Sequence, residues 1–314
     1  MKSSVKSKLI KYKSLIVFLV LCIGIAIIEP RFLSLNNIRN VFTQVSVNAI
    51  LAIGMTFVIL TGGIDLSVGS ILAISGAVAG VIVKTNGNVF LAVVVAILIG
   101  AAVGLVNGLV ISKGKIQAFI ATLATMTIFR GVTYVFTNGT PVSGLGLKFS
   151  KLGNARILDQ IPLPVLFMLV VFGIAFYILS QTRYGRYLYA LGGNEDSARL
   201  SGINTDKVKA IVYVISGIAA AISGIIVTSR IGSASPNAGN GFELDAIAAV
   251  VLGGTSLAGG EGSVAGTIIG ALIIGVLNNG LNLMNVSPFY QLIVKGAVIL
   301  LAVLMDRKVN SAKR

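Results

Sequence analysis

Residues 89–111 read VFLAVVVAILIGAAVGLVNGLVI, an apolar run without a single charged side chain. A helix of about 20 such residues is long enough to cross the hydrocarbon layer of a membrane. Within lipid every backbone amide and carbonyl needs a partner inside the protein, and a single run can provide those partners only as a helix. This run therefore predicts a membrane-spanning helix and, because similar runs recur, an all-α fold.

Similar runs cover most of the chain, which is 55% hydrophobic and 11% charged with a mean hydropathy of +0.95. Soluble domains carry about 25% charged residues. We therefore predict a polytopic membrane protein. About ten transmembrane helices are expected, at residues 14–28, 45–62, 66–83, 89–111, 116–136, 164–180, 207–229, 244–258, 263–284 and 289–305. The first and eighth runs are short, so a re-entrant path or misplaced ends are alternatives for both.

Domain organisation is simple, because no polar stretch is long enough for a second, soluble domain. We expect a basic tail at residues 1–13, one transmembrane domain at 14–306 and a C-terminal tail at 307–314. The lysine-rich start resembles a secretory signal. The residues after the first apolar run do not resemble a cleavage site, which predicts that the first helix is retained.

Lysine and arginine are distributed unevenly between the two sides of the predicted bundle. With the N-terminus inside, the inner side holds Lys2, Lys6, Lys8, Lys11, Lys13, Lys113, Lys115, Arg183, Arg186, Arg199, Lys207, Lys209, Arg307, Lys308, Lys313 and Arg314. The outer side holds Arg31, Arg39, Lys84, Lys148, Lys151, Arg156 and Arg230. The positive-inside rule therefore places both termini in the cytoplasm. This bias also accounts for the net charge of +15, and no basic soluble face with aromatic residues indicates nucleic-acid binding.

The residue types needed for metal or acid–base chemistry are scarce. The sequence has no histidine, and its one cysteine is Cys22. We therefore expect no metal site, no disulfide and no Ser-His-Asp chemistry, and the composition argues against an enzyme.

Glycine positions predict how the helices meet. Glycines recur at four-residue intervals in three runs: Gly76 and Gly80; Gly100, Gly104 and Gly108; Gly266 and Gly270. Small residues at this spacing let helix backbones approach closely in lipid. Two glycine-rich turns, GGIDLSVGS at 62–70 and GGTSLAGGEGS at 253–263, also resemble each other. Asp65 or Ser67 in the first turn is expected to cap the following helix, with a substrate role for Asp65 as the alternative.

Polar residues inside apolar runs are candidates for a transport path, because lipid penalises them unless they face protein or water. The candidates for the path are Asn48, Asp65, Asn107, Asn278 and Asn282. Uncharged amides of this kind could pass a sugar-sized polyol along. Hydrogen bonds between helices explain each asparagine equally well, including the neighbouring Asn279, so both interpretations stay open.

The polar segment TRYGRYLYALGGNEDSARLSGIN at 182–204 interrupts the apolar pattern. Asn194 is a good N-cap, acids follow it in the first turn, and Gly202 is placed to end a helix. The pattern predicts a short cytoplasmic helix from Glu195 to Ser201, suited to docking on a partner. An ordinary solvated loop is the alternative. The chain has no G-x-x-x-x-G-K-[ST] sequence with which to bind ATP.

Several long motifs resemble one family. The stretches GGIDLSVGS (62–70), GRYLYALGGNEDSARLSGI (185–203), ELDAIAAVVLGGTSLAGGEGS (243–263) and NNGLNL (278–283) resemble the permeases of bacterial monosaccharide ABC importers. Within that family, SVNAI (46–50), GMT (54–56), KGKIQAFIATL (113–123) and FTNG (136–139) are most similar to ribose permeases. The resemblance implies inward transport of a monosaccharide, expected to be D-ribose, with another pentose or hexose as the alternative.

The resemblance also implies partners. The permease would pair with a second copy of itself in the bacterial cytoplasmic membrane, a separate ATP-binding subunit would supply energy, and an extracytoplasmic sugar-binding protein would deliver the substrate. No cofactor is expected on this chain. The family's ATPase-coupling loop corresponds to residues 182–206, with Gly192, Gly193, Asn194, Glu195, Arg199 and Gly202. An ion-coupled secondary transporter is a weaker alternative, because such coupling needs paired charges within the membrane, and the sequence places only Arg130 and Lys295 clearly inside runs.

Overall fold

The computed structural model describes residues 13–311, so the expected tail at 1–13 lies almost entirely outside the described residues. The elements in chain order are α2 (Lys13–Ile28), η1 (Pro30–Leu33), α3 (Leu35–Leu60), α4 (Val68–Asn86), α5 (Val89–Ser112), α6 (Ala118–Phe136), β1 (Val142–Ser143), α7 (Gly146–Asn154), β2 (Arg156–Ile157), β3 (Ile161–Pro162), α8 (Leu163–Gln181), α9 (Arg183–Gly193), α10 (Glu195–Leu200), α11 (Thr205–Ile231), β4 (Ser233–Ala234), α12 (Phe242–Leu252), α13 (Val264–Leu283) and α14 (Pro288–Ser311).

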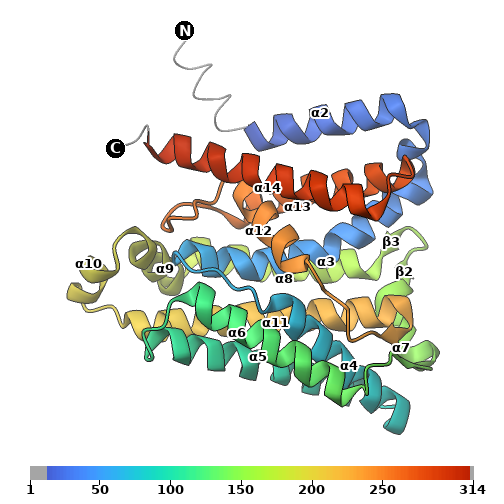
Figure 1. Cartoon of the computed structure of the whole chain (residues 1–314), viewed down its shortest axis with the longest axis horizontal. Coiled ribbons are helices and arrows are strands. Elements are labelled where there is room, and N and C mark those ends of the chain that lie inside the picture. Colours follow the sequence, from blue (N-terminus) through green and yellow to red (C-terminus); the bar gives the residue numbers. More distant parts are fainter. Residues whose placement is uncertain (1–12, 312–314) are drawn as a thin grey trace.

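The long helices lie side by side and run between two opposite ends of the molecule (Figure 1). One end carries α9 and α10, and we call it the α10 face. The other end carries α7, β2 and β3, and we call it the α7 face. The start of α2 and the end of α14 both lie toward the α10 face (Figure 1). The helices thus alternate in direction along the chain.

Seven helices in the described part of the chain are long and apolar enough to cross a membrane: α3, α4, α5, α6, α8, α11 and α13. Apolar segments of α2 and α14, at Ser14–Ile28 and Pro288–Leu304, are shorter. These nine helices coincide with nine of the ten expected runs. The prediction of a polytopic all-α bundle therefore holds for the described residues.

The expected span at 244–258 is wrong as a full-length helix. α12 has 11 residues, a length of about 16 Å against a hydrocarbon layer of about 30 Å. The chain on either side covers the remaining distance. On the α7 face, β4 before α12 pairs antiparallel with β1. On the α10 face, Gly260 beyond α12 donates its backbone N–H to the carbonyl of Leu60 at 3.0 Å.

The centre of the bundle is built from α3 and α11, which are buried along most of their length. α11 packs most extensively on α5, at the glycines whose spacing predicted close approach. A Cβ added to Gly100 would lie 2.3 Å from the Gly217 carbonyl oxygen, and one added to Gly104 would lie 2.2 Å from that of Tyr213. Only glycine permits this contact between the two backbones.

Two helix ends differ from the sequence pattern. α3 begins ten residues before the predicted run, because Ser34 caps it by accepting the backbone N–H of Asn37 at 3.4 Å. The polar residues in its first turns concealed this start. At the other terminus α14 continues to Ser311, so residues 307–311 of the expected tail are helical.

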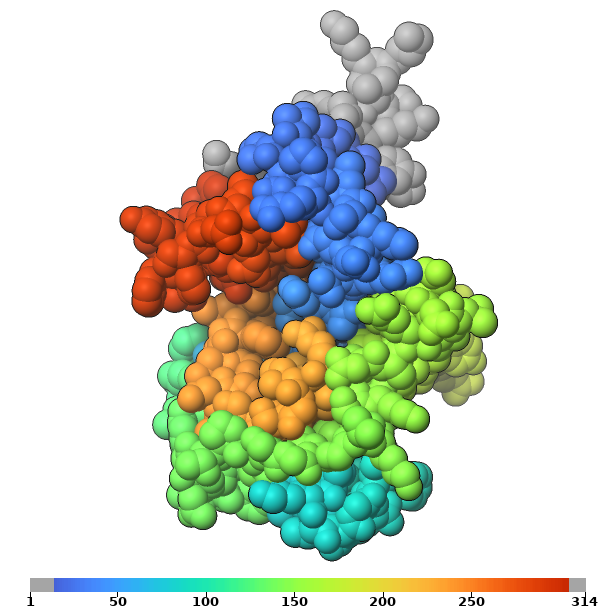
Figure 2. Space-filling model, turned by 90° about the vertical axis from the view of Figure 1, so that its right-hand side faces the viewer, coloured from blue at the N-terminus to red at the C-terminus, as the bar shows by residue number. Residues whose placement is uncertain are grey.

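The α7 face is made of connecting segments rather than long helices. Figure 2 looks onto it and shows the segment between α6 and α8 in light green, the segment between α11 and α12 in orange, the N-terminal elements in blue and α14 in red. Two short antiparallel pairs, β1 with β4 and β2 with β3, hold these segments together. They are the strands of the described chain, and they lie outside the helical bundle.

Candidate functional site

Three of the predicted path residues meet in one cavity of about 240 Å³. Asn48 comes from α3, and Asn278 and Asn282 come from α13, where they lie one turn apart. Gln44 on α3 and Gln291 on α14 add two further amides to the lining. Most lining residues belong to the half of each helix that is nearer the α7 face. The fold thus gathers amides from three helices, which are far apart in the sequence, around one polar space.

Neighbouring asparagines of α13 have different roles. Asn282 accepts a hydrogen bond from Gln291 Nε2 at 2.8 Å, and the Oδ1 of Asn278 is buried without a hydrogen-bond partner. Asn279 instead exchanges two hydrogen bonds with Asn37 of α3, at 2.9 and 2.8 Å, and is buried outside the cavity. Asn279 therefore makes hydrogen bonds between helices, which is one of the two interpretations offered for these asparagines, whereas Asn278 faces the cavity.

The same cavity contains a charged pair that sequence reasoning missed. Lys295 Nζ of α14 lies 3.0 Å from Asp245 Oδ2 of α12, and Asp245 is only 3% exposed. This pair adds charged groups to the uncharged amides that the sequence indicated. Lys295 was recognised as an intramembrane charge, but its partner was hidden in the first turn of the short α12, where an acid is equally typical of a helix start.

A second cavity of about 360 Å³ lies on the α7 face. Three arginines, Arg39, Arg156 and Arg230, line it without an acid in the described lining. Gln44 and Arg230 line both cavities, so the two spaces adjoin. Both cavities lie along a face of α3 that carries Gln44 and, one turn deeper into the bundle, Asn48.

The other two predicted path residues lie elsewhere. Asp65 is fully buried, and its carboxylate accepts hydrogen bonds from the backbone N–H and hydroxyl of Ser67 at 3.0 and 2.6 Å and from Ser216 Oγ at 2.8 Å. Asn107 donates to Ser67 Oγ at 2.9 Å and accepts from Thr125 at 2.6 Å. These bonds join the loop before α4 to α5, α6 and α11. Asp65 accepts the backbone N–H of Ser67, the residue before α4, but Ser67 makes no side-chain capping hydrogen bond to the helix. Neither Asp65 nor Asn107 lines the cavity.

On the α10 face the predicted short helix is confirmed. α10 runs from Glu195 to Leu200, and its N-cap Asn194 accepts the backbone N–H of Ser197 at 2.8 Å. Gly202 follows with a φ of +83°, a conformation that glycine adopts without strain. The local signals in this segment were therefore sufficient for its structure.

Sequence reasoning missed α9, which precedes α10. This helix begins after Thr182, whose hydroxyl accepts the backbone N–H of Gly185 at 3.2 Å. Leu188 and Leu191 bury one side of it. A cap followed by apolar residues at helical spacing was the signal, but the two glycines at its end made the segment resemble a loop.

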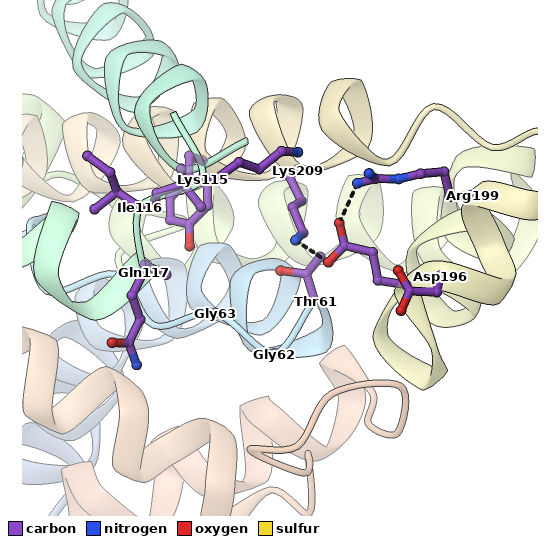
Figure 3. A pocket seen from close by; sticks show the side chains of 13 residues that line it. Thr61, Gly62, Gly63, Lys115, Ile116, Gln117, Asp196, Arg199 and Lys209 are labelled. Carbon is purple, nitrogen blue, oxygen red and sulfur yellow. Dashed lines mark hydrogen bonds and ion pairs between the residues drawn. The ribbon is translucent and has the colours of Figure 1, made fainter. Parts of the chain in front are cut away.

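A groove of about 380 Å³ separates α10 from the loops after α3 and α5 (Figure 3). Arg199 and Lys209 both contact the carboxylate of Glu195, the former at 3.0 Å (Figure 3). Arg199 and Lys115 also pair with Asp206, at 3.7 and 2.7 Å. Burial raises the pKa of Glu195, but the hydrogen bond from Lys209 and the nearby positive charges outweigh it and hold this pKa below its ordinary value. Glu195 is thus ionised at neutral pH and ties α10 to α11.

Three glycine-rich segments meet beside this groove. A Cβ on Gly192 would lie 1.9 Å from the carbonyl oxygen of Leu60 and 2.4 Å from the nitrogen of Gly260. Tyr189 of α9 also donates to the carbonyl of Gly262 at 2.9 Å. The end of α9 therefore contacts the end of α3 and the turn before α13, and both of these helices contribute asparagines to the cavity. We call this contact of residues 60, 192 and 260 the glycine junction.

Comparison with known proteins gives a consistent picture. A family model described as "Branched-chain amino acid transport system / permease component" matches residues 37–303. The chain is 56% identical to the ribose import permease protein of Escherichia coli (strain K12) over 96% of this chain and 95% of the relative. It is 52% identical to the ribose import permease protein of Bacillus subtilis (strain 168), over 92% and 90%.

A relative that is named for a different sugar is less similar. The D-allose transport system permease protein of Escherichia coli (strain K12) is 42% identical over 93% of this chain and 91% of its own length. No solved structure matches significantly.

Proposed function

The chain belongs to the family of permease components that the matching model describes, and we propose that it is the membrane subunit of an ABC importer that carries D-ribose inward. It is a multi-pass protein of the bacterial cytoplasmic membrane. The observation that carries the choice of ribose is the 56% identity, over 96% of the chain, to a ribose import permease. The greater distance of the D-allose relative supports ribose over a hexose.

The cavity fits this proposal. It offers amides from Asn48, Asn278 and Asn282, which can exchange hydrogen bonds with the hydroxyl groups of a sugar without holding it firmly. A transport path needs such weak binding, since a state that held the sugar tightly would resist its release. The arginine-lined cavity on the α7 face then stands at the entrance, where a sugar-binding protein would dock, with the segment Leu145–Gln160 nearby.

The α10 face fits the contact with a separate ATP-binding subunit. The residues proposed for this coupling are Gly192, Gly193, Asn194, Glu195, Arg199 and Gly202. The capped helix and its ion pairs support a defined docking surface, and the glycine junction supplies a route from that surface to the helices of the cavity. In this proposal the α10 face is cytoplasmic, in agreement with the distribution of basic residues.

We also propose that two copies of the chain form the pathway. The helices α5, α6 and α8 present wide apolar faces that are exposed in the single chain, including Phe119 and Ile128 of α6. In a membrane these faces meet lipid or a second copy.

The ion pair between the buried Asp245 and the half-buried Lys295 is the observation that favours an ion-coupled transporter instead. Paired intramembrane charges of this kind carry proton or ion coupling in such proteins. The two mechanisms differ in their energy source. Uptake driven by an ion gradient without ATP would favour the second mechanism.

The test of the proposed function is uptake by the reconstituted importer. We expect proteoliposomes to accumulate labelled ribose only when the sugar-binding protein outside and ATP inside are both present, and to accept D-allose less well. Ribose binding to the permease without its binding protein is expected to be weak, with a dissociation constant of about 1 mM or more. Tight binding by this chain alone, or uptake without ATP, would contradict the proposal.

A further inference from the structure

We propose that Asp245, Lys295 and Asn278 form a subsite that recognises two adjacent hydroxyl groups of the transported sugar. The inference rests on the proposed function and extends it, because it assigns recognition of a vicinal diol to a charged pair and one amide. The three residues come from α12, α14 and α13 and line the same cavity.

The side chains of Asp245, Lys295 and Asn278 can form more hydrogen bonds than the protein itself provides. Lys295 Nζ donates to Asp245 Oδ2 at 3.0 Å, and both the ammonium group and the carboxylate can form further hydrogen bonds. The Oδ1 of Asn278 is buried and has no hydrogen-bond partner. Buried polar atoms are nearly always bonded, so an unpaired one inside a polar cavity indicates a missing partner.

The chemistry of this arrangement matches a diol. A carboxylate oxygen and an amide oxygen only accept hydrogen bonds, whereas an ammonium group only donates them. A sugar hydroxyl does both. One hydroxyl can donate to Asp245 while its neighbour accepts from Lys295 and donates to Asn278. Phe242 also lines the cavity and can cover the C–H face of a sugar ring.

A purely stabilising role explains the pair less well. A buried ion pair is often no more stabilising than apolar residues of the same volume, because both charges lose their hydration. An ionisable residue inside a membrane bundle commonly marks a substrate pathway. Here the carboxylate is 3% exposed and yet lines the cavity together with Asn48, Asn278 and Asn282.

The experiment compares D-ribose with 2-deoxy-D-ribose, which lacks one hydroxyl of the 2,3-diol. Weak binding of each sugar to the assembled permease–ATPase complex in nanodiscs, without the sugar-binding protein, is measured by saturation-transfer NMR. We expect the wild type to prefer ribose. Asp245→Asn and Lys295→Gln should each weaken ribose binding about tenfold, as for loss of a hydrogen bond to a charged group, and remove the preference. Glu29→Gln, which breaks an ion pair that lines neither cavity, is the matched control and should retain the preference.

The exchanged variant Asp245→Lys with Lys295→Asp separates recognition from structure. It keeps an ion pair but reverses donor and acceptor, so we expect its melting temperature to recover while ribose preference does not. Three results would each contradict the proposed subsite. They are recovery of both melting temperature and ribose preference in the exchanged variant, an unchanged preference in Asp245→Asn, and no preference in the wild type. If only the subsite is wrong, the wild-type importer still takes up ribose. If the proposed function is wrong, there is no ATP-dependent uptake at all.

Discussion

At the scale of single residues, chemically identical side chains in α13 have different surroundings. Asn278 lines the cavity and carries an unpaired buried oxygen, while Asn279 is bonded twice to Asn37. The sequence identified both as polar residues in an apolar run. It could not separate them, because a one-residue step turns a helical side chain by about 100°, and the direction of the core was unknown.

This difference yields a matched test. Asn278→Leu should reduce ribose uptake several-fold and leave the melting temperature of the detergent-solubilised protein nearly unchanged. Asn279→Leu leaves Asn37 without its partner and should cost about 1 kcal/mol of stability, seen as a lower melting temperature. Equal effects of the two substitutions on melting temperature would contradict the assignment of Asn278 to the cavity.

The adjacent glycines at the end of α9 offer a second pair. In Gly192→Ala the new methyl group would lie 1.9 Å from the Leu60 carbonyl oxygen, so α9 must move away from α3. We expect ATP hydrolysis by the assembled importer to continue while ribose uptake falls at least several-fold. Gly193→Ala meets no atom within 4 Å and should behave like the wild type. Full coupling in Gly192→Ala would show that the glycine junction does not transmit movement.

At the scale of elements, local signals predicted some helices and tertiary contacts determined others. α10 was predicted almost to the residue because Asn194 and the acids after it act within one turn. α12 was predicted too long, because the apolar residues after Leu252 continue the pattern although Gly253 and Gly254 end the helix. Apolar composition indicates that such a segment is buried, but it does not distinguish a helix from a turn.

The ion pairs of α10 predict how the element behaves when its charges change. Reversal by Glu195→Lys and Arg199→Glu should weaken binding of the ATP-binding subunit in a pull-down assay, while membrane insertion stays intact. Because Glu195 has a lowered pKa, its contacts with Arg199 and Lys209 are complete at neutral pH and are lost only as the pH falls below 4.5.

A control for that experiment is the reversal of an ion pair on the opposite face. Glu29 and Arg31 pair at 2.7 Å near the start of η1, far from α10, and their exchange should leave the pull-down unchanged. Wild-type association is expected to be constant between neutral pH and about pH 5. Unchanged binding and unchanged transport after reversal at Glu195 and Arg199 would exclude α10 as the docking element.

At the scale of the whole molecule, the positions and order of the seven long helices of the described residues could be predicted from hydropathy alone. Lipid requires a similar length and the same internal hydrogen bonding of each spanning helix. The cavity could not be predicted in this way. Its residues come from α3, α11, α12, α13 and α14, and no local pattern indicates which helices are neighbours. For this reason Asn107 was grouped with Asn48, although it bonds to Ser67 and Thr125 in a separate network.

The proposed placement of the two faces on opposite sides of the membrane gives a prediction for the topology. After Cys22 is replaced by serine, single cysteines at Gly193 and at Ser150 should react with an impermeant maleimide from the cytoplasmic side and from the outer side, respectively. Both positions lie in connecting segments at opposite ends of the bundle. Labelling of both from the same side would overturn the proposed topology.

The shortness of α12 bears on how the chain enters the membrane during synthesis. The insertion machinery releases segments into lipid according to their length and hydrophobicity, and acidic residues in a segment oppose its release. With 11 residues and Glu243 and Asp245 in its first turn, α12 is poorly suited to leave the translocon by itself. We expect it to reach its position only after α14 has been made, when Lys295 becomes available to neutralise Asp245. If synthesis stops before α14 is made, α12 would therefore stay outside its native position. Proteases that remove unfinished membrane proteins could then cleave it.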